Sequence, residues 1–264
     1  MSSPPASGVW WAATLFFLVA FAAALVADRL DARLIGTEGV WVKPAKFALS
    51  LGLHFATLAL ITGLLGSAAQ RSGGLSAVAL AASVCAVLEL GYIAVQAGRQ
   101  LPSHFHVVTP LYAGLYAAMA VGAVVIILAA GIVGVIALAD SSAPITPPLR
   151  LAIGIGLIGG TLLTLITAFR LGGNGGHTIG LEAPGAARMP LTGWSLTVGD
   201  LRPPHFLATH MIQAIPLVGL VAARLLPEGM AIAAVLAVSA GWTGLTVLTF
   251  LTALAGRPLP FLGQ

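Results

Sequence analysis

Histidines in the second half of the chain are the residues best suited to chemistry. His205 and His210 lie in the stretch RPPHFLATHMIQ, which ends at Gln213. Imidazole nitrogens bind divalent metals and haem iron, and they exchange protons near neutral pH. These two histidines are five residues apart, about 140° around an ideal helix, so they cannot easily ligate one ion together. A mononuclear metal site with a carboxylate, or haem held by histidines from different helices, is compatible with the predicted ligands His104, His177, His205 and His210.

Acidic and basic groups give a second set of candidates. Glu89, Gln96 and Arg99 share one face of a predicted helix at offsets of seven and three residues. A carboxylate inside a membrane is expensive unless it is protonated, paired or bound to a cation. Asp200 precedes His205 by five residues, so it either caps the following helix and pairs with Arg202 or orients a histidine. The predicted catalytic residues are Glu89, Arg99 and Asp200.

Lys43 and Lys46 open another apolar segment and lie on one helical face with His54. Together with arginines they suit an anionic or quinone-like headgroup, although interfacial lysines also extend their charges to water without a further role. The predicted ligand-binding or cofactor-binding residues are Lys43, Lys46, Gln96, Arg202 and Gln213.

The composition predicts a membrane protein. Of 264 residues, 58% are hydrophobic and 8% are charged, and the mean hydropathy is +1.01. A typical soluble domain carries about 25% charged residues. The 12 Lys and Arg residues occur singly and without an aromatic platform, which argues against nucleic-acid binding and fits basic loops that face anionic lipid. A single cysteine, Cys85, excludes an internal disulfide and a cysteine-rich metal site.

Uncharged apolar runs predict an all-α bundle of seven transmembrane helices in a single domain over residues 1–264. Each run is long enough to cross about 30 Å of hydrocarbon. Nine of the 12 Lys and Arg residues fall in alternate loops and the C-terminal tail, which predicts an outside N-terminus and a cytoplasmic C-terminus. Thr109 and Pro110 predict a helix start. The predicted spans are 8–27, 44–66, 74–98, 109–139, 151–169, 204–223 and 230–255.

Several sequence blocks resemble a widespread, uncharacterised family of bacterial multi-pass membrane proteins. The blocks are WVKPAKFALS (41–50), SHFHVVTP (103–110), HTIG (177–180) and GWSLTVGDLRPPHFLATHMIQAIP (193–216). The resemblance implies a location in the bacterial cytoplasmic (inner) membrane and a shared site, but no reaction. This chain has His106 where family members usually carry Asn. The residues implied are Lys43, Lys46, Glu89, Gln96, Arg99, Ser103, His104, His177, Asp200, Arg202, His205, His210 and Gln213.

A weaker resemblance is to seven-helix zinc hydrolases of the alkaline ceramidase type. It rests on Ser50 and His54, which form S-x-x-x-H on the second span. Those enzymes carry a histidine pair on the last helix, where this chain has no histidine, and that puts the resemblance in doubt.

Three functions remain open from the sequence. A metal-dependent or haem-dependent redox enzyme acting on a lipophilic or quinone-like substrate explains the histidines. A proton-coupled small-molecule carrier explains Glu89, and a non-catalytic assembly partner explains the lack of a full catalytic motif. The lipid bilayer is the one partner that the sequence predicts; the cofactor, if any, and protein partners are left open.

Overall fold

The computed structural model describes residues 5–259, and seven helical segments in this range are long and apolar enough to cross a membrane. The all-α, multi-pass prediction is confirmed, and the helix ends lie within a few residues of those predicted; the orientation of the termini stays a prediction. The segments are α1 (Ala6–Leu30), α2 (Val42–Gly63), α4 (Gly73–Gly98), α5 (Pro110–Ala139), the continuous α6 (Pro147–Ile153), η1 (Gly154–Gly159) and α7 (Gly160–Gly173), α8 (Arg202–Leu225) and α9 (Glu228–Leu254).

The chain divides into two compact units, residues 1–145 and 146–264. The first contains α1, α2, α4 and α5, and the second contains α6 to α9. The prediction of a single domain over the whole chain stays a prediction, and its residues 1–4 and 260–264 lie outside the described part.

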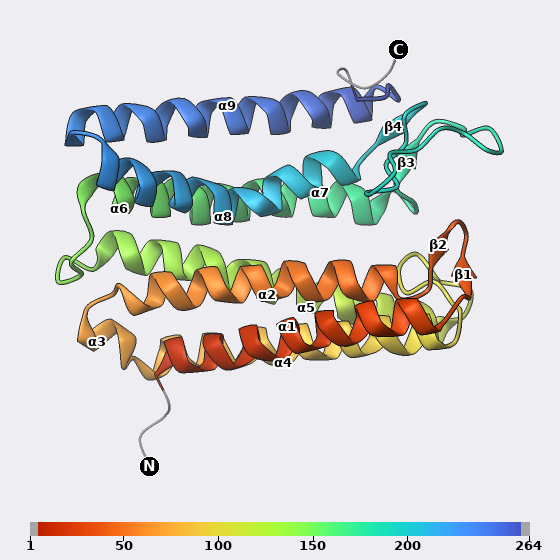
Figure 1. Ribbon diagram of the computed structural model, residues 1–264, viewed down its shortest axis with the longest axis horizontal. Helices are drawn as coiled ribbons and strands as arrows, with labels where there is room; N and C mark the ends of the chain where they lie inside the picture. Colours follow the sequence, from red (N-terminus) through yellow and green to blue (C-terminus); the bar gives the residue numbers. More distant parts are fainter. Residues whose placement is uncertain (1–4, 260–264) are drawn as a thin grey trace. The chain divides into compact units, whose positions relative to one another are not determined.

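In the first unit, α1 and α2 pack side by side through aromatic rings (Figure 1). Phe55 of α2 stacks between Trp10 and Phe17 of α1, with 5.5 Å between ring centroids in both pairs. All three rings are fully buried, so this stack fixes the two helices against each other.

Short connections close the two ends of the first unit (Figure 1). The hairpin of β1 (Leu34–Ile35) and β2 (Glu38–Gly39) joins α1 to α2, and α3 (Ser67–Gln70) lies between α2 and α4 at the opposite end. Thr109 accepts a hydrogen bond from the Tyr112 amide, and Pro110 occupies the first turn of α5. The predicted helix start at Thr109 and Pro110 is therefore confirmed.

In the second unit, the fifth span packs closely on α8 through glycines. A methyl group added at Gly156 would lie 2.5 Å from Pro216 Cδ, and one at Gly160 would lie 2.7 Å from Ile212 Cγ1. A methyl group at Gly219 would overlap the side chain of Ala152. Small residues at such positions let membrane helices approach closely, so glycine sets the distance between these two spans.

Both helices of this interface are irregular. The fifth span contains the π-helical segment η1, and α8 contains Pro216, which has no N–H to donate to the preceding turn. Gly156 of η1 lies directly against Pro216. The two irregular segments therefore pack on each other.

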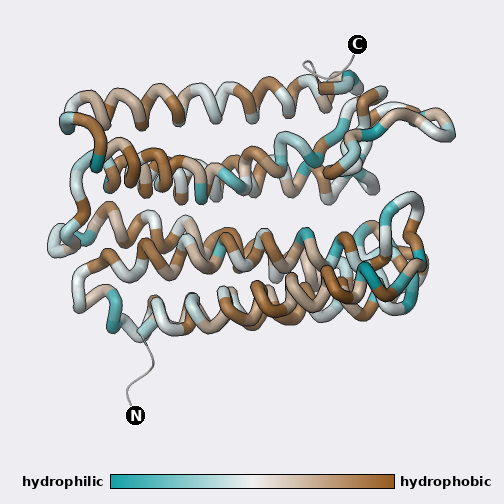
Figure 2. Tube along the Cα trace, in the orientation of Figure 1, coloured by the Kyte–Doolittle hydropathy of each residue, from teal (hydrophilic) through white to brown (hydrophobic). Residues whose placement is uncertain are grey.

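Polar residues gather where the helices end. Figure 2 shows hydrophobic colours along the long helices and hydrophilic ones around the β1–β2 hairpin and in the connection that contains β3 (Thr178–Ile179) and β4 (Gly199–Asp200). These two strands pair antiparallel, with Thr178 opposite Asp200. This small sheet leads the chain into the first turn of α8.

Candidate functional site

The residues predicted to form a site fall into two groups, one in each unit. The group in the first unit, which we call the Lys43 cluster, consists of Lys43, Glu89, Gln96, Ser103 and His104. Lys43 comes from the first turn of α2, Glu89 and Gln96 from α4, and Ser103 and His104 from the connection between α4 and α5.

Lys43 and His104 are in direct contact. The ammonium nitrogen of Lys43 lies 3.1 Å from His104 Nδ1, and Ser103 Oγ lies 3.1 Å from the same ring nitrogen. Because a protonated lysine can only donate, His104 Nδ1 accepts this hydrogen bond. The contact therefore places a cation and an imidazole together at the start of α2.

Tight backbone geometry holds the segment that carries His104. Gln100 and Phe105 have φ angles of 58° and 60°, in the left-handed region that non-glycine residues rarely adopt. The Leu101 amide donates to the Gln96 carbonyl, and the Gln96 side chain donates to the Pro102 carbonyl at 3.3 Å. Gln96 thus supports this turn from a buried position, and its predicted role in ligand binding stays a prediction.

Aromatic rings surround His104, and the sequence did not predict them as part of a site. The Phe47 ring centroid lies 5.4 Å from that of His104, and the Tyr116 centroid lies 6.1 Å away. Phe105 packs on Tyr116 at 5.6 Å. One signal was present, because Phe47 follows Lys43 by four residues and so shares its helical face.

Glu89 is the most unusual member of the cluster. Its side chain lies on α4 and is only 8% exposed. It forms no hydrogen bond or direct ion pair with any residue in 5–259. Lys43 attracts it electrostatically from beyond direct contact. A carboxylate in a membrane helix therefore lacks the direct partner that such a group ordinarily requires.

Two other predicted residues of the first unit lie outside the cluster. Lys46 forms an exposed ion pair with Glu38 at 3.1 Å. Arg99 follows α4 and is exposed, and its side chain forms no hydrogen bond or ion pair within the described range. Neither contacts Lys43 or His104, so the structure does not join them to the cluster.

Ionic contacts at the hairpin stabilise the same end of the first unit. Asp31 accepts hydrogen bonds from the Arg33 guanidinium at 2.7 Å and from the Trp41 indole at 2.8 Å. These donors hold the pKa of the Asp31 carboxyl well below its usual range, with Arg33 as the larger cause. Arg33 also donates to the Gly98 carbonyl, which ties the hairpin to the end of α4.

In the second unit, Asp200 organises the entry into α8. Its carboxylate accepts from the Arg202 guanidinium at 2.6 and 3.0 Å, from the Arg202 amide at 2.9 Å and from the Ser195 amide at 2.8 Å. The Asp200 side chain is 1% exposed and that of Arg202 is 22% exposed. The sequence left two roles open for Asp200. This geometry matches the first role, in which the carboxylate caps the start of α8 and pairs with Arg202. Asp200 makes no contact with His205, which the second role would require.

His205 contacts a residue of α7 and not Asp200. Its Nδ1 lies 3.1 Å from Thr167 Oγ1. Thr167 is one of three threonines spaced three residues apart on α7, with Thr161 and Thr164, and such hydroxyl residues commonly pack between membrane helices. All three are indeed buried, but pairing between α7 and α8 gives Thr167 a polar partner that spacing alone could not identify.

The remaining predicted residues of this unit have separate surroundings. His210 Nδ1 lies 2.9 Å from the Phe206 carbonyl, and its ring stacks on Phe206 at 4.0 Å. Gln213 Oε1 is buried without a hydrogen-bond partner in the described residues. The His177 carbonyl accepts the Leu201 amide at 2.9 Å.

Within residues 5–259, no three His, Cys, Asp or Glu side chains lie close enough together to hold a metal ion. The predicted metal role of His104, His177, His205 and His210 therefore gains no support from side-chain clustering. It stays a prediction, as does the haem alternative.

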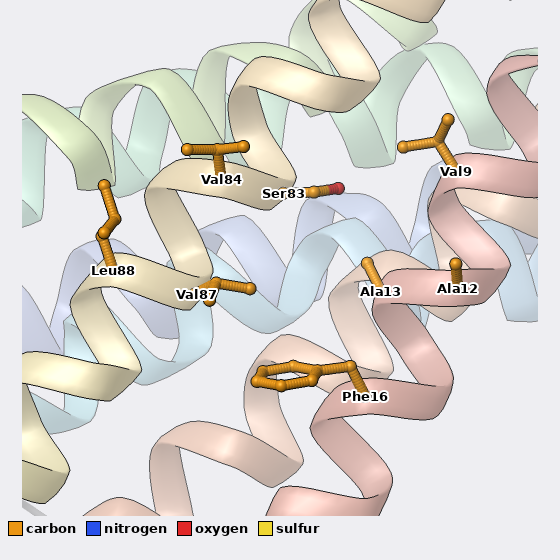
Figure 3. Close-up of a pocket in the computed structure, with 8 residues that line it drawn as sticks. All are labelled: Val9, Ala12, Ala13, Phe16, Ser83, Val84, Val87 and Leu88. Atoms are coloured by element: carbon orange, nitrogen blue, oxygen red, sulfur yellow. The ribbon is translucent and has the colours of Figure 1, made fainter.

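Two shallow grooves are apolar and carry none of the predicted residues. One, of about 330 Å³, lies between α1 and α4, where Ser83 supplies the only hydroxyl among the eight lining residues (Figure 3). The other, of about 430 Å³, lies along the last turns of α8 from Leu217 to Leu226. Lipid chains are as apolar as this lining, so the grooves do not by themselves indicate a ligand site.

Comparison of the chain with family models, with curated proteins and with solved structures found no match.

Proposed function

We propose that the chain is a multi-pass protein of the bacterial cytoplasmic membrane that binds a small molecule at the Lys43 cluster and exchanges a proton through Glu89. This is the activity of a proton-coupled carrier. The sequence blocks around Lys43 and His104 also favour membership of the uncharacterised membrane family that they resemble.

The observation that carries the proposal is the position of Glu89. Its carboxyl group is buried in α4 with no direct partner among the described residues. Because Lys43 attracts this group without contacting it directly, a proton or a group on a ligand is needed to neutralise it fully. When a proton and a ligand group compete for Glu89, binding of one releases the other. This linkage between ligand binding and proton binding is what proton coupling requires.

Lys43 adds a positive charge to the same cluster. Its ammonium group contacts His104 and attracts Glu89. It also lies in the first turn of α2, where the unpaired amides give the helix end a partial positive charge. These features suit a ligand with a negative or strongly hydrogen-bond-accepting group.

One observation favours a second function, a redox enzyme acting on a quinone-like substrate. Phe47 and Tyr116 flank His104, and aromatic side chains beside a cation suit a flat headgroup with carbonyl oxygens. An absorption spectrum and metal analysis of the purified protein test this function. A haem band, or quinone reduction that disappears in Lys43→Met, supports the enzyme over the carrier.

The carrier is tested by the pH dependence of ligand binding. A panel of organic acids, amines and neutral solutes is first screened for those that raise the unfolding temperature of the protein in nanodiscs. Exchange of one proton changes the affinity of a bound solute by up to about tenfold per pH unit. We expect that dependence in the wild type and a flat profile in Glu89→Gln.

Glu228→Gln is the matched control, because Glu228 is an exposed carboxylate in the first turn of α9. It should retain the wild-type pH dependence. An unchanged pH profile in Glu89→Gln, or a panel in which no solute binds to the wild type, would contradict the proposal.

A further inference from the structure

The hydrogen bond between α7 and α8 fixes which nitrogen of His205 carries a proton. Thr167 Oγ1 lies 2.9 Å from the Leu163 carbonyl and 3.1 Å from the Thr164 carbonyl, both in its own helix. A carbonyl oxygen only accepts, so the single hydroxyl proton of Thr167 is directed to these two acceptors. The lone pairs of the hydroxyl oxygen then remain for His205 Nδ1, 3.1 Å away.

His205 Nδ1 is therefore the donor in this contact. A neutral imidazole has one N–H and one lone pair, so protonation at Nδ1 leaves Nε2 with an unshared electron pair. His205 Nε2 makes no hydrogen bond within the described residues. Thr167 is buried and held by the helix, so both the ring orientation and the tautomer are set before any ligand arrives.

The protonated nitrogen of His210 is identified in the same way, from an oxygen that can only accept a hydrogen bond. Its Nδ1 lies 2.9 Å from the Phe206 carbonyl, which can only accept, so this nitrogen carries a proton as well. Stacking on Phe206 fixes the plane of the ring. In the neutral form, His205 and His210 of α8 therefore both carry the unshared electron pair on Nε2.

We propose that Thr167 is a positioning residue that holds His205 in the Nδ1-protonated tautomer, so that His205 Nε2 binds an electron-pair acceptor. The acceptor is either a metal ion or the N–H or O–H group of a ligand. A histidine that ligates a metal commonly donates its other ring N–H to an oxygen in this way, and loss of that oxygen weakens metal binding by about 10-fold to 100-fold. The proposal rests on residues of the second unit alone and does not depend on the carrier function.

Nuclear magnetic resonance of the full-length protein, with ¹⁵N in the histidine rings, tests the tautomer directly. The His205 signals are assigned by their loss in His205→Gln. We expect a protonated Nδ1 and an unprotonated Nε2 in the wild type. Thr167→Ser keeps the hydroxyl and should keep this pattern, whereas Thr167→Val removes it and should give mixed or reversed protonation.

Thr164→Val is a control, because Thr164 lies on the same buried face of α7 but Thr167 is the residue bonded to His205. It should leave the His205 pattern unchanged. A wild-type His205 protonated at Nε2, or an identical pattern in Thr167→Val, would overturn the proposal whether or not any variant is less stable.

Addition of Zn²⁺ to the labelled protein distinguishes the two kinds of acceptor. A shift of the His205 Nε2 signal that needs about 10-fold to 100-fold more Zn²⁺ in Thr167→Val than in Thr167→Ser supports the metal ion. An Nδ1-protonated wild type whose Nε2 signal does not respond to Zn²⁺ supports a ligand N–H or O–H. An equal Zn²⁺ response in the two variants contradicts the positioning role of Thr167.

Discussion

Replacement of Gly219 by alanine tests whether close packing of the fifth span on α8 holds the second unit together. The added methyl group would overlap Ala152 Cβ, and it would also lie 3.4 Å from Leu149 Cα and from the Pro148 carbonyl oxygen. These atoms belong to the backbone or are attached directly to it, so no side-chain rotation can make room. The two helices must separate if Gly219→Ala is to fit.

The size of the effect follows from two opposing terms. Overpacking a well-packed core costs about 1–3 kcal/mol, whereas alanine is favoured over glycine within a helix by about 0.8–1 kcal/mol. We therefore expect a net loss of about 0.5–2 kcal/mol in the free energy of unfolding, taking these terms together. Unfolding in mixed micelles of mild detergent and dodecyl sulfate, followed by circular dichroism, measures this difference.

Gly241→Ala is the matched control. Gly241 also lies within a membrane helix, but no atom comes within 4 Å of a methyl group added there. Only the helix preference applies, so this variant should gain about 0.5–1 kcal/mol. In Gly219→Ala, the further change Ala152→Gly removes the overlapping atom and should recover part of the loss. Equal stability of Gly219→Ala and Gly241→Ala would refute the packing argument.

Three further predictions concern single groups at the ends of the helices. Asp200→Asn removes the charge that binds Arg202 and should lower the free energy of unfolding by about 1.5–3 kcal/mol; an unfolding midpoint equal to that of the wild type would show that a neutral cap suffices. The pKa of Asp31 is held below its ordinary value of 3.8, so its stabilising effect is full above that pH and is lost as the pH falls towards the lower folded-state pKa. Unfolding midpoints of wild type and Asp31→Asn should therefore differ at neutral pH and converge in acid, and a constant difference would contradict this. Cysteines at Ala183 and Ser141, in a Cys85→Ser background, should react with an impermeant thiol reagent from the cytoplasmic and outer sides respectively; labelling of both from one side would end the predicted topology.

The membrane helices were predictable because their signal is local. A span must satisfy its own backbone and present apolar side chains over about 20 residues, and both requirements are visible in a single stretch of sequence. The start of α5 was equally local, since Thr109 and Pro110 act within one turn. The π-helical segment η1 was not predicted, because the run GIGLIG also fits an ordinary apolar helix and its contact with Pro216 is not visible in the sequence.

The candidate site was only partly predictable for a related reason. Lys43, Glu89 and His104 were identified by residue type and helical face, and the structure brings Lys43 and His104 into contact. The rings around His104 come from segments on either side of it, and Thr167 reaches His205 from another helix. Such contacts depend on the register between helices, which one sequence does not specify.

Asp200 shows how the surroundings decide between alternatives that residue type leaves open. Its position before α8 allowed either a cap or a histidine partner. The carboxylate accepts hydrogen bonds from the Arg202 amide and guanidinium, which is the first alternative, and also from the Ser195 amide in an irregular loop. No periodic pattern in the sequence predicts that Ser195 lies beside Asp200. The sequence alone therefore could not decide between the two roles of Asp200.

Infrared titration of the carboxyl groups tests the central role of Glu89 most directly. The protein in nanodiscs is titrated from acid to alkaline pH, and the carbonyl stretch of protonated carboxyl groups is compared in wild type, Glu89→Gln and Glu228→Gln. We expect a band that changes with pH in the wild type and in Glu228→Gln and that is absent from Glu89→Gln. The same band, with the same pH dependence, in all three proteins would contradict this expectation.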